Sequence, residues 1–445
     1  MAAPPLNIAV VGSGIAGLSA AWLLSKAHTV TVFEREQRLG GHSNTVDILT
    51  PEGRLAVDTG FIVFNKRCYP NLVNLFNTLG VEYQATDMSF GVSINQGELE
   101  YAGADSLRPL FAQKRNLLRP RFWRMIRDLI RFYRDSDDWL KSLDDTTTLG
   151  DLLARGGYGD GFRDDHLIPM GAAIWSTPAA QMADYPAKAF LQFCENHGLL
   201  QLSDRPQWQT VVGGSREYVR KIGHEISGDI LLGTGISRIE RHPDGVSLTD
   251  EHGVTRQFDH VVLAGHADQS LAMLGDASVT EQALLSQFRY EHNTAWLHCD
   301  PSLMPRRKGA WASWCYLSDR QNSQGKVAVS YWMNRLQHLP GKTPIIVTLN
   351  PTHEPAPDKC FQRFDYEHPQ FNVAALQAQR HLWDLQGTNS TWFCGSYFGH
   401  GFHEDGIQSG LAVAEALGGV ERPWKLDDPN SRIYTTAPMP SAEAA

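Results

Sequence analysis

The chain has 445 residues, which is too long for one ordinary hydrophobic core and predicts roughly two domains. A hydrophobic fraction of 42% with twelve Trp excludes a disordered or fibrous class, and a net charge of −9 predicts no nucleic acid partner. The six cysteines lack CxxC spacing, which favours a reduced cytoplasmic setting without zinc or disulfides. With no signal-peptide pattern and no apolar run of ~18 residues, a soluble or peripherally attached protein is expected.

Residues 8–41 predict a dinucleotide-binding βαβ unit. Gly12 permits the tight turn after a buried strand, Gly14 removes the Cβ that would block a pyrophosphate, and Gly17 lets the following helix lie close to the strand. The helix N-terminus then presents free N–H groups to the phosphates. Glu34 ends the second strand, where its carboxylate would accept ribose hydroxyls and repel the 2′-phosphate of an NADP-type ligand.

The rest of the chain predicts alternating blocks. A helix is expected around 71–79, a hairpin of strands 88–94 and 98–101 about an Asn-Gln-Gly turn, and mostly helices over 106–200. Further strands are expected at 236–241, 246–250, 260–264, 294–299, 311–317, 327–333, 345–349 and 391–394, with a last helix at 407–417. We predict a cofactor-binding domain of residues 1–86, 201–275 and 386–420, a substrate domain of residues 87–200 and 276–385, and a loosely held tail at 421–445.

Two further glycine-rich segments separate FAD from NAD. Residues 38–41, Arg-Leu-Gly-Gly, let the backbone pass close to a cofactor that continues beyond its pyrophosphate. Residues 393–407 form a glycine-rich loop that leads into a helix, whose dipole suits the negative charge of a reduced flavin. Together with residues 8–41, they resemble the flavin-containing amine oxidase and phytoene desaturase superfamily.

That resemblance implies an α/β fold with a Rossmann-like FAD-binding domain and an interleaved α+β substrate domain, the two-domain architecture of amine oxidases and p-hydroxybenzoate hydroxylase. It implies that Glu34 holds the adenosine ribose and that the Ile407 amide reaches flavin O2. Family members usually carry Asp or Glu where Ser396 stands, so the contact there differs. The expected FAD-binding residues are Gly12, Gly14, Ile15, Ala16, Gly17, Glu34, Arg35, Gly40, Gly41, His42, Gly60, Phe61, Ile236, Gly395, Ser396, Asp405, Gly406 and Ile407.

A narrower resemblance concerns the substrate. DTGFIVFN at 58–65, TVVGGSREYV at 210–219 and GFHEDG at 401–406 resemble bacterial FAD-binding proteins related to the flavoprotein domain of plant cyclopropane fatty acid synthases. This implies an unsaturated acyl chain of a lipid as substrate, dehydrogenated or isomerised by hydride transfer to flavin N5. The alternatives are an oxidase of a small amine and a non-catalytic flavoprotein partner of a lipid methyltransferase.

His403 is the candidate catalytic residue, because by the resemblance it occupies the position of an aromatic residue beside the flavin. A neutral imidazole there could exchange a proton near pH 7, or it could simply pack on the ring. His400 and His403 lack the spacing of a helical zinc motif, so no metal is expected. Lys308 is the candidate for the lysine that amine oxidases place near N5, unless it belongs to a solvated turn.

Residues 114–134 predict a basic amphipathic helix with eight cations and one acid. Such a helix could lie on an anionic membrane surface and bring acyl chains to the protein, which would place the chain at the inner membrane face. The alternative is an ordinary surface helix of the substrate domain.

Overall fold

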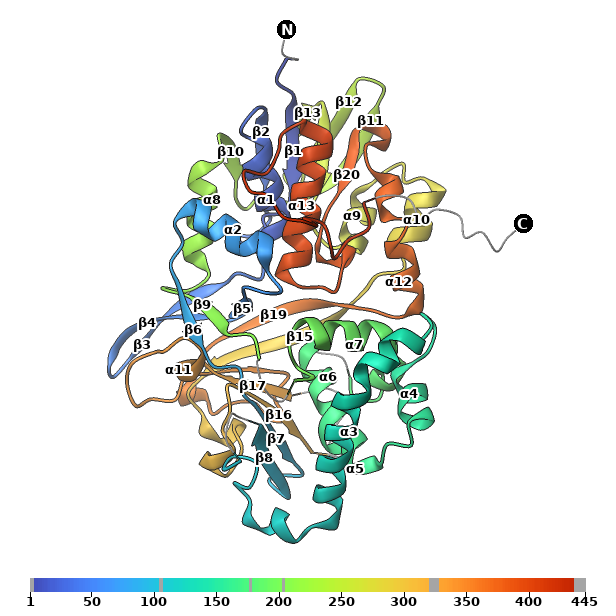
Figure 1. The fold of residues 1–445 in the computed structure, drawn as a ribbon. Helices are drawn as coiled ribbons and strands as arrows, with labels where there is room; N and C mark the ends of the chain where they lie inside the picture. The colour runs from blue at the N-terminus through green and yellow to red at the C-terminus, as the bar shows by residue number, and fades with distance from the viewer. Residues whose placement is uncertain (1–3, 104–106, 176–177, 202–204, 320–327, 436–445) are drawn as a thin grey trace, which may run out of the picture.

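The structure is a computed structural model that describes residues 4–103, 107–175, 178–201, 205–319 and 328–435 (Figure 1). Val327, the expected first residue of a strand, and residues 436–445 of the expected tail lie outside these ranges. Within the described ranges, no helix is long and apolar enough to cross a bilayer.

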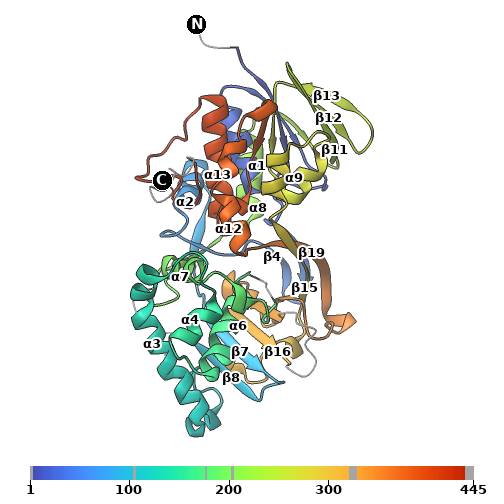
Figure 2. The same ribbon diagram turned by 90° about the vertical axis from the view of Figure 1, so that its right-hand side faces the viewer.

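A five-stranded parallel sheet forms one half of the molecule. Its strands, in spatial order, are β10 (Gly228–Leu231), β2 (Thr29–Phe33), β1 (Asn7–Val11), β14 (His260–Leu263) and β20 (Thr391–Phe393). Ile8 and Val10 pack on one face with helices α1 (Ile15–Leu24) and α13 (His403–Gly418). Ala9 and Val11 pack on the other face, in the same core cluster as the three-stranded sheet of β11 (Ile236–His242), β12 (Gly245–Asp250) and β13 (Thr255–Phe258) (Figure 2). Burial on both faces explains the unbroken apolar runs of these strands.

A seven-stranded mixed sheet forms the other half. Its order is β19 (Cys360–Gln370), β15 (Arg289–His298), β18 (Ile346–Leu349), β17 (Ala328–Trp332), β16 (Trp314–Ser318), β7 (Phe90–Ile94) and β8 (Leu99–Gly103). The expected hairpin of β7 and β8 is present, and Asn95, Gln96 and Gly97 all have positive φ. Strand β19, which was not among the expected strands, pairs with β15 along nearly its whole length.

Helices from the middle of the chain lie beside this sheet (Figures 1 and 2). They are the short 3₁₀ helix η1 (Lys114–Leu118), α3 (Pro120–Ser142), α4 (Leu149–Arg155), α5 (Asp160–Phe162), α6 (Ile168–Trp175) and α7 (Ala187–Asn196). The expectation of a mainly helical segment over 106–200 is confirmed for its described residues.

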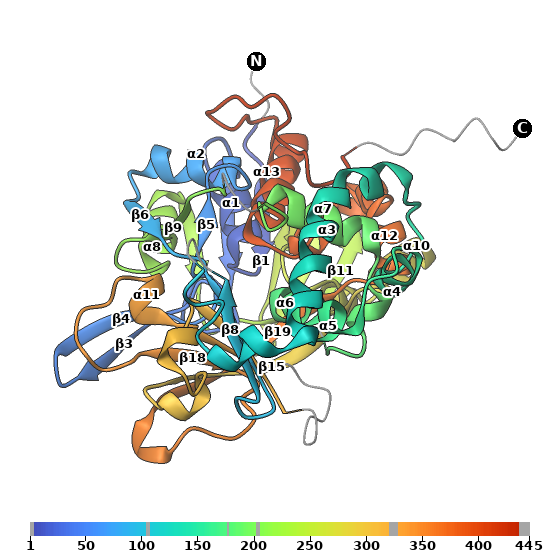
Figure 3. The ribbon, with the colours of Figure 1, turned by 60° about the horizontal axis from the view of Figure 1, so that its bottom comes forward.

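The remaining elements connect the two halves. They are β3 (Thr45–Thr50), β4 (Gly53–Asp58), β5 (Phe64–Asn65), α2 (Pro70–Leu79), β6 (Tyr83–Thr86), β9 (Trp208–Val211), α8 (Arg216–Glu225), α9 (Ala267–Met273), α10 (Val279–Leu285), α11 (Met333–Leu336) and α12 (Val373–Gln379). The β3–β4 hairpin projects from the side of the molecule (Figure 3). Asp58, at the end of β4, accepts hydrogen bonds from Ser215 N–H and the Gln337 side chain, so it joins segments that lie far apart in the sequence.

The segment 421–435 corrects the expectation of a loosely held tail. Trp424 stacks on Trp22 of α1 with ring centroids 6.0 Å apart. The Arg432 guanidinium lies 3.3 Å from the carboxylate of Asp405, and the two side chains are 8% and 0% exposed. The composition of the segment, which is rich in Pro and Ala, did not predict these contacts. The reason is that only a few large side chains hold the segment against the rest of the protein.

Candidate cofactor site and cavity

A cavity of about 710 Å³ lies where the glycine-rich segments of the chain meet. It extends from the β1–α1 turn, past residues 40–42 and 59–63, to α6 and strands β16 and β17. The expected site residues that line it are Gly12, Gly14, Ile15, Ala16, Glu34, Arg35, Gly40, Gly41, His42, Gly60, Phe61, Ile236, Gly395, Ser396 and His403. Three separated parts of the chain therefore converge on one cavity.

The turn between β1 and α1 has the geometry of a phosphate cradle. Gly12 has φ +102° and approaches the backbone of Ala264, where a side chain would be strained. A Cβ on Gly14 would meet no atom within 4 Å and would instead stand at the cavity wall. Gly14 is also the N-cap of α1 and provides no side-chain cap, so the first N–H groups of the helix stay available to an anion.

Glu34 lies at the end of β2 beside this turn. Its Oε2 accepts the Ser13 N–H at 3.0 Å and its Oε1 accepts the Glu36 N–H at 2.8 Å. Oε2 also accepts the Ser13 hydroxyl at 2.5 Å, so these bonds fix the carboxylate at the cavity wall while Oε1 keeps a second lone pair. The position suits a ribose diol, as the sequence predicted.

The Gly40–Gly41 turn brings His42 to the cavity. Gly40 donates its N–H to the Ser13 carbonyl at 3.0 Å, and a Cβ on Gly41 would lie 3.2 Å from Gly14 Cα. His42 Nε2 is buried without a hydrogen-bond partner among the described residues, which marks it as an atom that a ligand could satisfy. Burial and the nearby His266 lower the pKa of His42 to about 4, so its ring is neutral at pH 7.

His403 lies in the cavity wall in a polar and aromatic environment. Its ring stacks on Phe61 with centroids 3.6 Å apart, and its Nε2 lies 2.9 Å from Ser43 Oγ and 3.0 Å from Tyr218 Oη. Burial, with a smaller contribution from His42, lowers the pKa of His403 to about 3. The residue is therefore a neutral imidazole held by two hydroxyl groups at physiological pH.

Four expected cofactor residues lie outside the cavity lining: Gly17, Asp405, Gly406 and Ile407. Gly17 and Gly406 allow close backbone packing, because a Cβ on Gly17 would overlap the Gly12 carbonyl and one on Gly406 would lie 2.9 Å from Ile15 Cγ2. Asp405 accepts the Phe402 N–H at 2.8 Å and pairs with Arg432, while Ile407 is fully buried in the core. In the structure these four residues take part in packing and capping, and their contact with a cofactor stays a prediction.

Strand β19 supplies cavity residues that the sequence analysis missed. Tyr366, Glu367 and His368 all line the cavity, and Tyr366 Oη contacts Asn44 Nδ2 at 3.0 Å and Thr59 Oγ1 at 2.7 Å. Burial lowers the pKa of His368 to about 3. The period-two alternation of aromatic rings along 364–368 is the signal that could have found this strand.

The far part of the cavity, which we call the apolar arm, is lined by hydrophobic and aromatic side chains. Its residues are Met88, Ala173, Ile174, Trp175, Leu199, Trp314, Tyr331 and Leu349. Trp314 and Tyr331 are cross-strand partners on this side of the sheet, whereas Trp311 and Trp332 pack against each other with centroids 5.4 Å apart. Lys308 is exposed and does not line the cavity, so it belongs to a solvated turn.

Comparisons with known proteins agree with this geometry. The family model for flavin containing amine oxidoreductases matches residues 15–309. A Mycobacterium tuberculosis protein named as a flavin-containing monoamine oxidase, AofH, is 26% identical over 275 residues, which are 56% of this chain and 55% of that protein. The NADPH glutamate synthase small chain of the same species is 71% identical over 36 residues, 8% of this chain and 7% of that one.

Solved structures share the fold over almost the whole chain. A fatty acid isomerase from P. acnes that produces CLA has a TM-score of 0.66 at 15% identity and covers 93% of this chain and 98% of its own. Putrescine oxidase with bound putrescine has a TM-score of 0.66 at 14% identity, covering 93% and 99%. Cyclohexylamine oxidase from Brevibacterium oxydans has a TM-score of 0.65 at 15% identity, covering 94% and 99%.

The fold and the cavity thus define the class of protein as a flavoprotein in which a parallel-sheet half and a mixed-sheet half share one cavity. The chain belongs to the family of flavin containing amine oxidoreductases, which are FAD-dependent enzymes, and its cofactor is FAD. The open space at Gly14, the uncapped start of α1 and the unpartnered His42 Nε2 all fit this cofactor. The chain spans about half the length of the monoamine oxidase relative.

Proposed function

We propose that the protein is a cytoplasmic FAD-dependent oxidoreductase that dehydrogenates or isomerises an unsaturated fatty acyl chain. The observation that carries this proposal is the apolar arm, which continues from the cofactor part of the cavity and is lined by aliphatic and aromatic side chains. Bound FAD supplies a two-electron acceptor at N5. The protein supplies a dry, shaped channel that holds the acyl carbon near that acceptor.

The charges of the cavity support an uncharged reacting group. Three carboxylates line the cavity. They are Glu34, directly after β2, Glu251, beside residues 234–237, and Glu367. Glu367 lies 2.9 Å from His292 Nδ1 and 3.2 Å from His266 Nδ1. None of them belongs to the apolar arm, so a substrate ammonium placed there would lose its hydration without gaining a counter-charge.

An amine substrate is the second candidate function. Putrescine oxidase shares this fold, and the aromatic rings of the apolar arm, such as Trp314 and Tyr331, could hold a cation through their π-faces. No lysine lines the cavity within the described part of the chain, so the lysine expected near N5 of an amine oxidase has no counterpart there.

The test is anaerobic mixing of the FAD-loaded protein with long-chain unsaturated fatty acids and with phospholipids that carry them. Dehydrogenation moves two electrons to the flavin, so the flavin absorbance should bleach while the lipid gains a double bond. Isomerisation returns the hydride to another carbon, so the flavin spectrum should recover while mass spectrometry finds a shifted double bond. Unchanged lipid, together with peroxide release when the protein is mixed with a panel of amines in the presence of oxygen, would overturn the proposal.

A substitution in the apolar arm separates substrate binding from cofactor binding. Ile174→Asp places a carboxylate among apolar side chains and should lower acyl turnover by at least about tenfold, because the charge loses hydration there. FAD occupancy should stay at the wild-type level. Leu49→Asp, at a residue that is 79% exposed on the β3–β4 hairpin, is the matched control and should leave turnover unchanged.

A further inference from the structure

Residues 107–119, which precede α3, lie at the end of the molecule farthest from β1 and α1 (Figures 1 and 2). Residues 107–127 contain seven Arg and Lys and no Asp or Glu, although the whole chain carries a net charge of −9. Arg108, Lys114 and Arg124 are exposed and have no hydrogen bond or ion pair within the described residues. Their charges are therefore available to a partner.

Exposed apolar side chains accompany these cations. Of the eleven large hydrophobic residues that are exposed in the described part of the chain, five lie between 107 and 130. Leu107, Leu117 and Leu118 are 72%, 48% and 87% exposed, and Trp123 and Ile130 are 47% and 48% exposed. Trp123 Nε1 donates to the Leu117 carbonyl at 2.9 Å, which holds the ring beside the two leucines. Water-exposed leucine and tryptophan grouped in this way mark an interaction surface.

The structure places the exposed apolar surface on different residues from those that the sequence predicted. The sequence suggested that the whole helix over 114–134 could lie on a membrane, but the apolar face of α3 is already used. Phe122, Met125 and Phe132 of that helix are at most 2% exposed and pack in the core. The free apolar groups instead belong to η1 and the first turns of α3.

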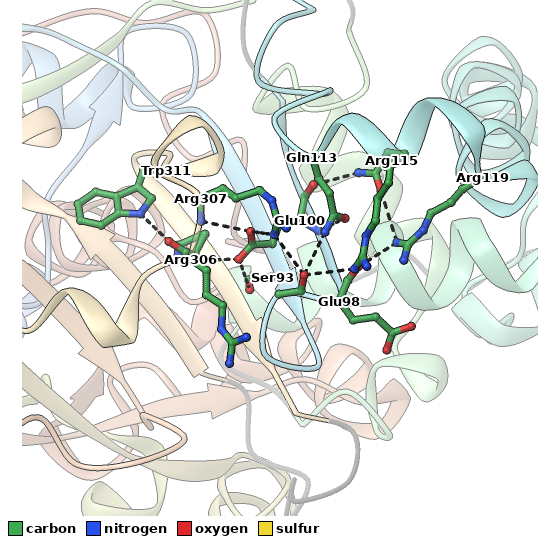
Figure 4. A network of polar contacts seen from close by, with 12 residues as sticks. Ser93, Glu98, Glu100, Gln113, Arg115, Arg119, Arg306, Arg307 and Trp311 are labelled. Carbon is green, nitrogen blue, oxygen red and sulfur yellow. Dashed lines mark hydrogen bonds and ion pairs between the residues drawn. The ribbon is translucent and has the colours of Figure 1, made fainter.

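The surrounding backbone is held by a polar network (Figure 4). Buried Glu100 accepts the N–H groups of Arg306 and Arg307 at 2.7 and 3.2 Å and pairs with the Arg307 guanidinium at 2.7 Å. Arg119 Nη1 donates to the Glu98 carbonyl at 2.9 Å. The network joins the β7–β8 turn, η1 and residues 306–307, and it brings Arg115, Arg119, Arg306 and Arg307 close to Glu98 and Glu100. These four cations outnumber the two carboxylates.

We propose that η1, the first turns of α3 and residues 306–308 dock on the surface of an anionic lipid bilayer. Leu117, Leu118 and Trp123 would enter the headgroup region while Lys114 and Arg124 contact lipid phosphates. The exposed leucines favour a lipid surface over a nucleic acid, because a phosphate backbone offers them no apolar partner. Docking requires no turnover, so this inference stands independently of the proposed acyl chemistry.

Flotation of the FAD-loaded, full-length protein with vesicles tests the apolar part. Vesicles of phosphatidylcholine mixed with phosphatidylglycerol should carry the wild-type protein at low salt, and pure phosphatidylcholine vesicles should not. Leu117→Ser with Leu118→Ser should reduce binding at least tenfold, because two groups that enter the interface are lost. Leu49→Ser with Val279→Ser removes two apolar groups elsewhere, 79% and 84% exposed, and should bind as the wild type.

The charged part is tested with Lys114→Glu and Arg124→Glu. Each lost charge should weaken binding about fivefold, and binding should fall further as salt is added. Arg155→Glu with Lys425→Glu changes the same net charge at other exposed sites and should bind more tightly than the Lys114 and Arg124 variant. Wild-type protein that ignores anionic vesicles, binds both vesicle types equally, or binds RNA in preference to vesicles would overturn the proposal, as would equal binding by the two charge variants.

Discussion

At Gly14, the absence of a side chain leaves room for a ligand rather than for packing. Its φ of −65° and ψ of 177° suit any residue, and a Cβ would meet no atom within 4 Å. Gly14→Val should therefore fold normally but weaken FAD binding at least about tenfold, because the branched side chain stands where a phosphate approaches α1.

The ratio of flavin to protein absorbance and titration of the apoprotein with FAD measure this effect. Gly103→Val is the matched control, since that strand residue also has open space around it. Full FAD occupancy in the Gly14 variant would contradict the placement of the phosphates at this turn.

His403 combines an aromatic stack with two hydroxyl contacts, and the two can be separated. His403→Phe keeps a ring against Phe61 but leaves the hydroxyls of Ser43 and Tyr218 without their nitrogen partner. This should cost about 1–3 kcal/mol of folding stability while FAD stays bound.

Because the pKa of His403 is lowered to about 3, its protonation should not shape the rate of flavin reduction between pH 5 and 8. Stopped-flow reduction across that range measures the profile for the wild type and the variant. A wild-type rate that changes near pH 6.5 and loses this change in the variant would show that the imidazole titrates.

At the scale of elements, the contact between α1 and α13 decides where the cavity forms. A Cβ on Gly410 would overlap the Ala16 carbonyl, which belongs to the backbone and cannot rotate away. Gly410→Ala should therefore destabilise the fold by about 2–3 kcal/mol and lower FAD retention, because it pushes α13 from the helix whose N-terminus borders the cavity.

Gly223→Ala in α8 is the control. Its Cβ would meet only the flexible ends of Leu39 and Ile230, and alanine favours a helix, so its stability should match or exceed the wild type. Thermal unfolding of apo and FAD-loaded protein measures both effects. A Gly410 variant with wild-type stability would contradict the close packing.

The sequence predicted those elements for which the hydrophobic periodicity and the spacing of the glycines indicate the same structure. The βαβ unit, the β7–β8 hairpin and the closing helix α13 follow from apolar runs and turn residues. Strand β19 was not predicted, because Pro369 and the charged residues along it argue against a paired strand and outweighed the alternation of aromatic rings at 364–368. The sequence could not separate packing from cofactor contact at Gly406, since a glycine that admits a helix gives the same signal as one that admits a ligand.

At the scale of the whole molecule, the two halves share one cavity, and burial, both at this cavity and elsewhere, suppresses histidine charge. Burial lowers the pKa of His42, His166, His266 and His298 to about 4 and that of His197, His368 and His403 to about 3. All seven are neutral in the folded protein at pH 5, whereas the unfolded chain would protonate them below about pH 6.5.

A lipid methyltransferase as the partner of this protein stays a prediction.

Acid should therefore destabilise the protein well before its carboxylates titrate. Between pH 6.5 and 4 the unfolded chain binds more protons at these histidines, so stability is lost as the pH falls through this window. Asp58 and Glu404 act in the opposite direction, because burial raises the pKa of Asp58 to about 6 and also raises that of Glu404, but two carboxyl groups face seven imidazoles. The melting temperature of the FAD-loaded protein, measured at about pH 7.5, 6.5, 5.5 and 4.5, should fall steadily below pH 6.5.

His368→Gln tests the cause. An amide in place of the ring can still meet Asn293, which donates to His368 Nδ1 at 2.9 Å, but it cannot take up a proton. The variant should lose less stability than the wild type between pH 6.5 and 4.5. His292→Gln, at a side chain that is 81% exposed, should keep the wild-type slope, because an exposed ring is hydrated in both states. A wild-type melting temperature that stays level or rises on acidification would show that the buried histidines already carry protons in the folded protein.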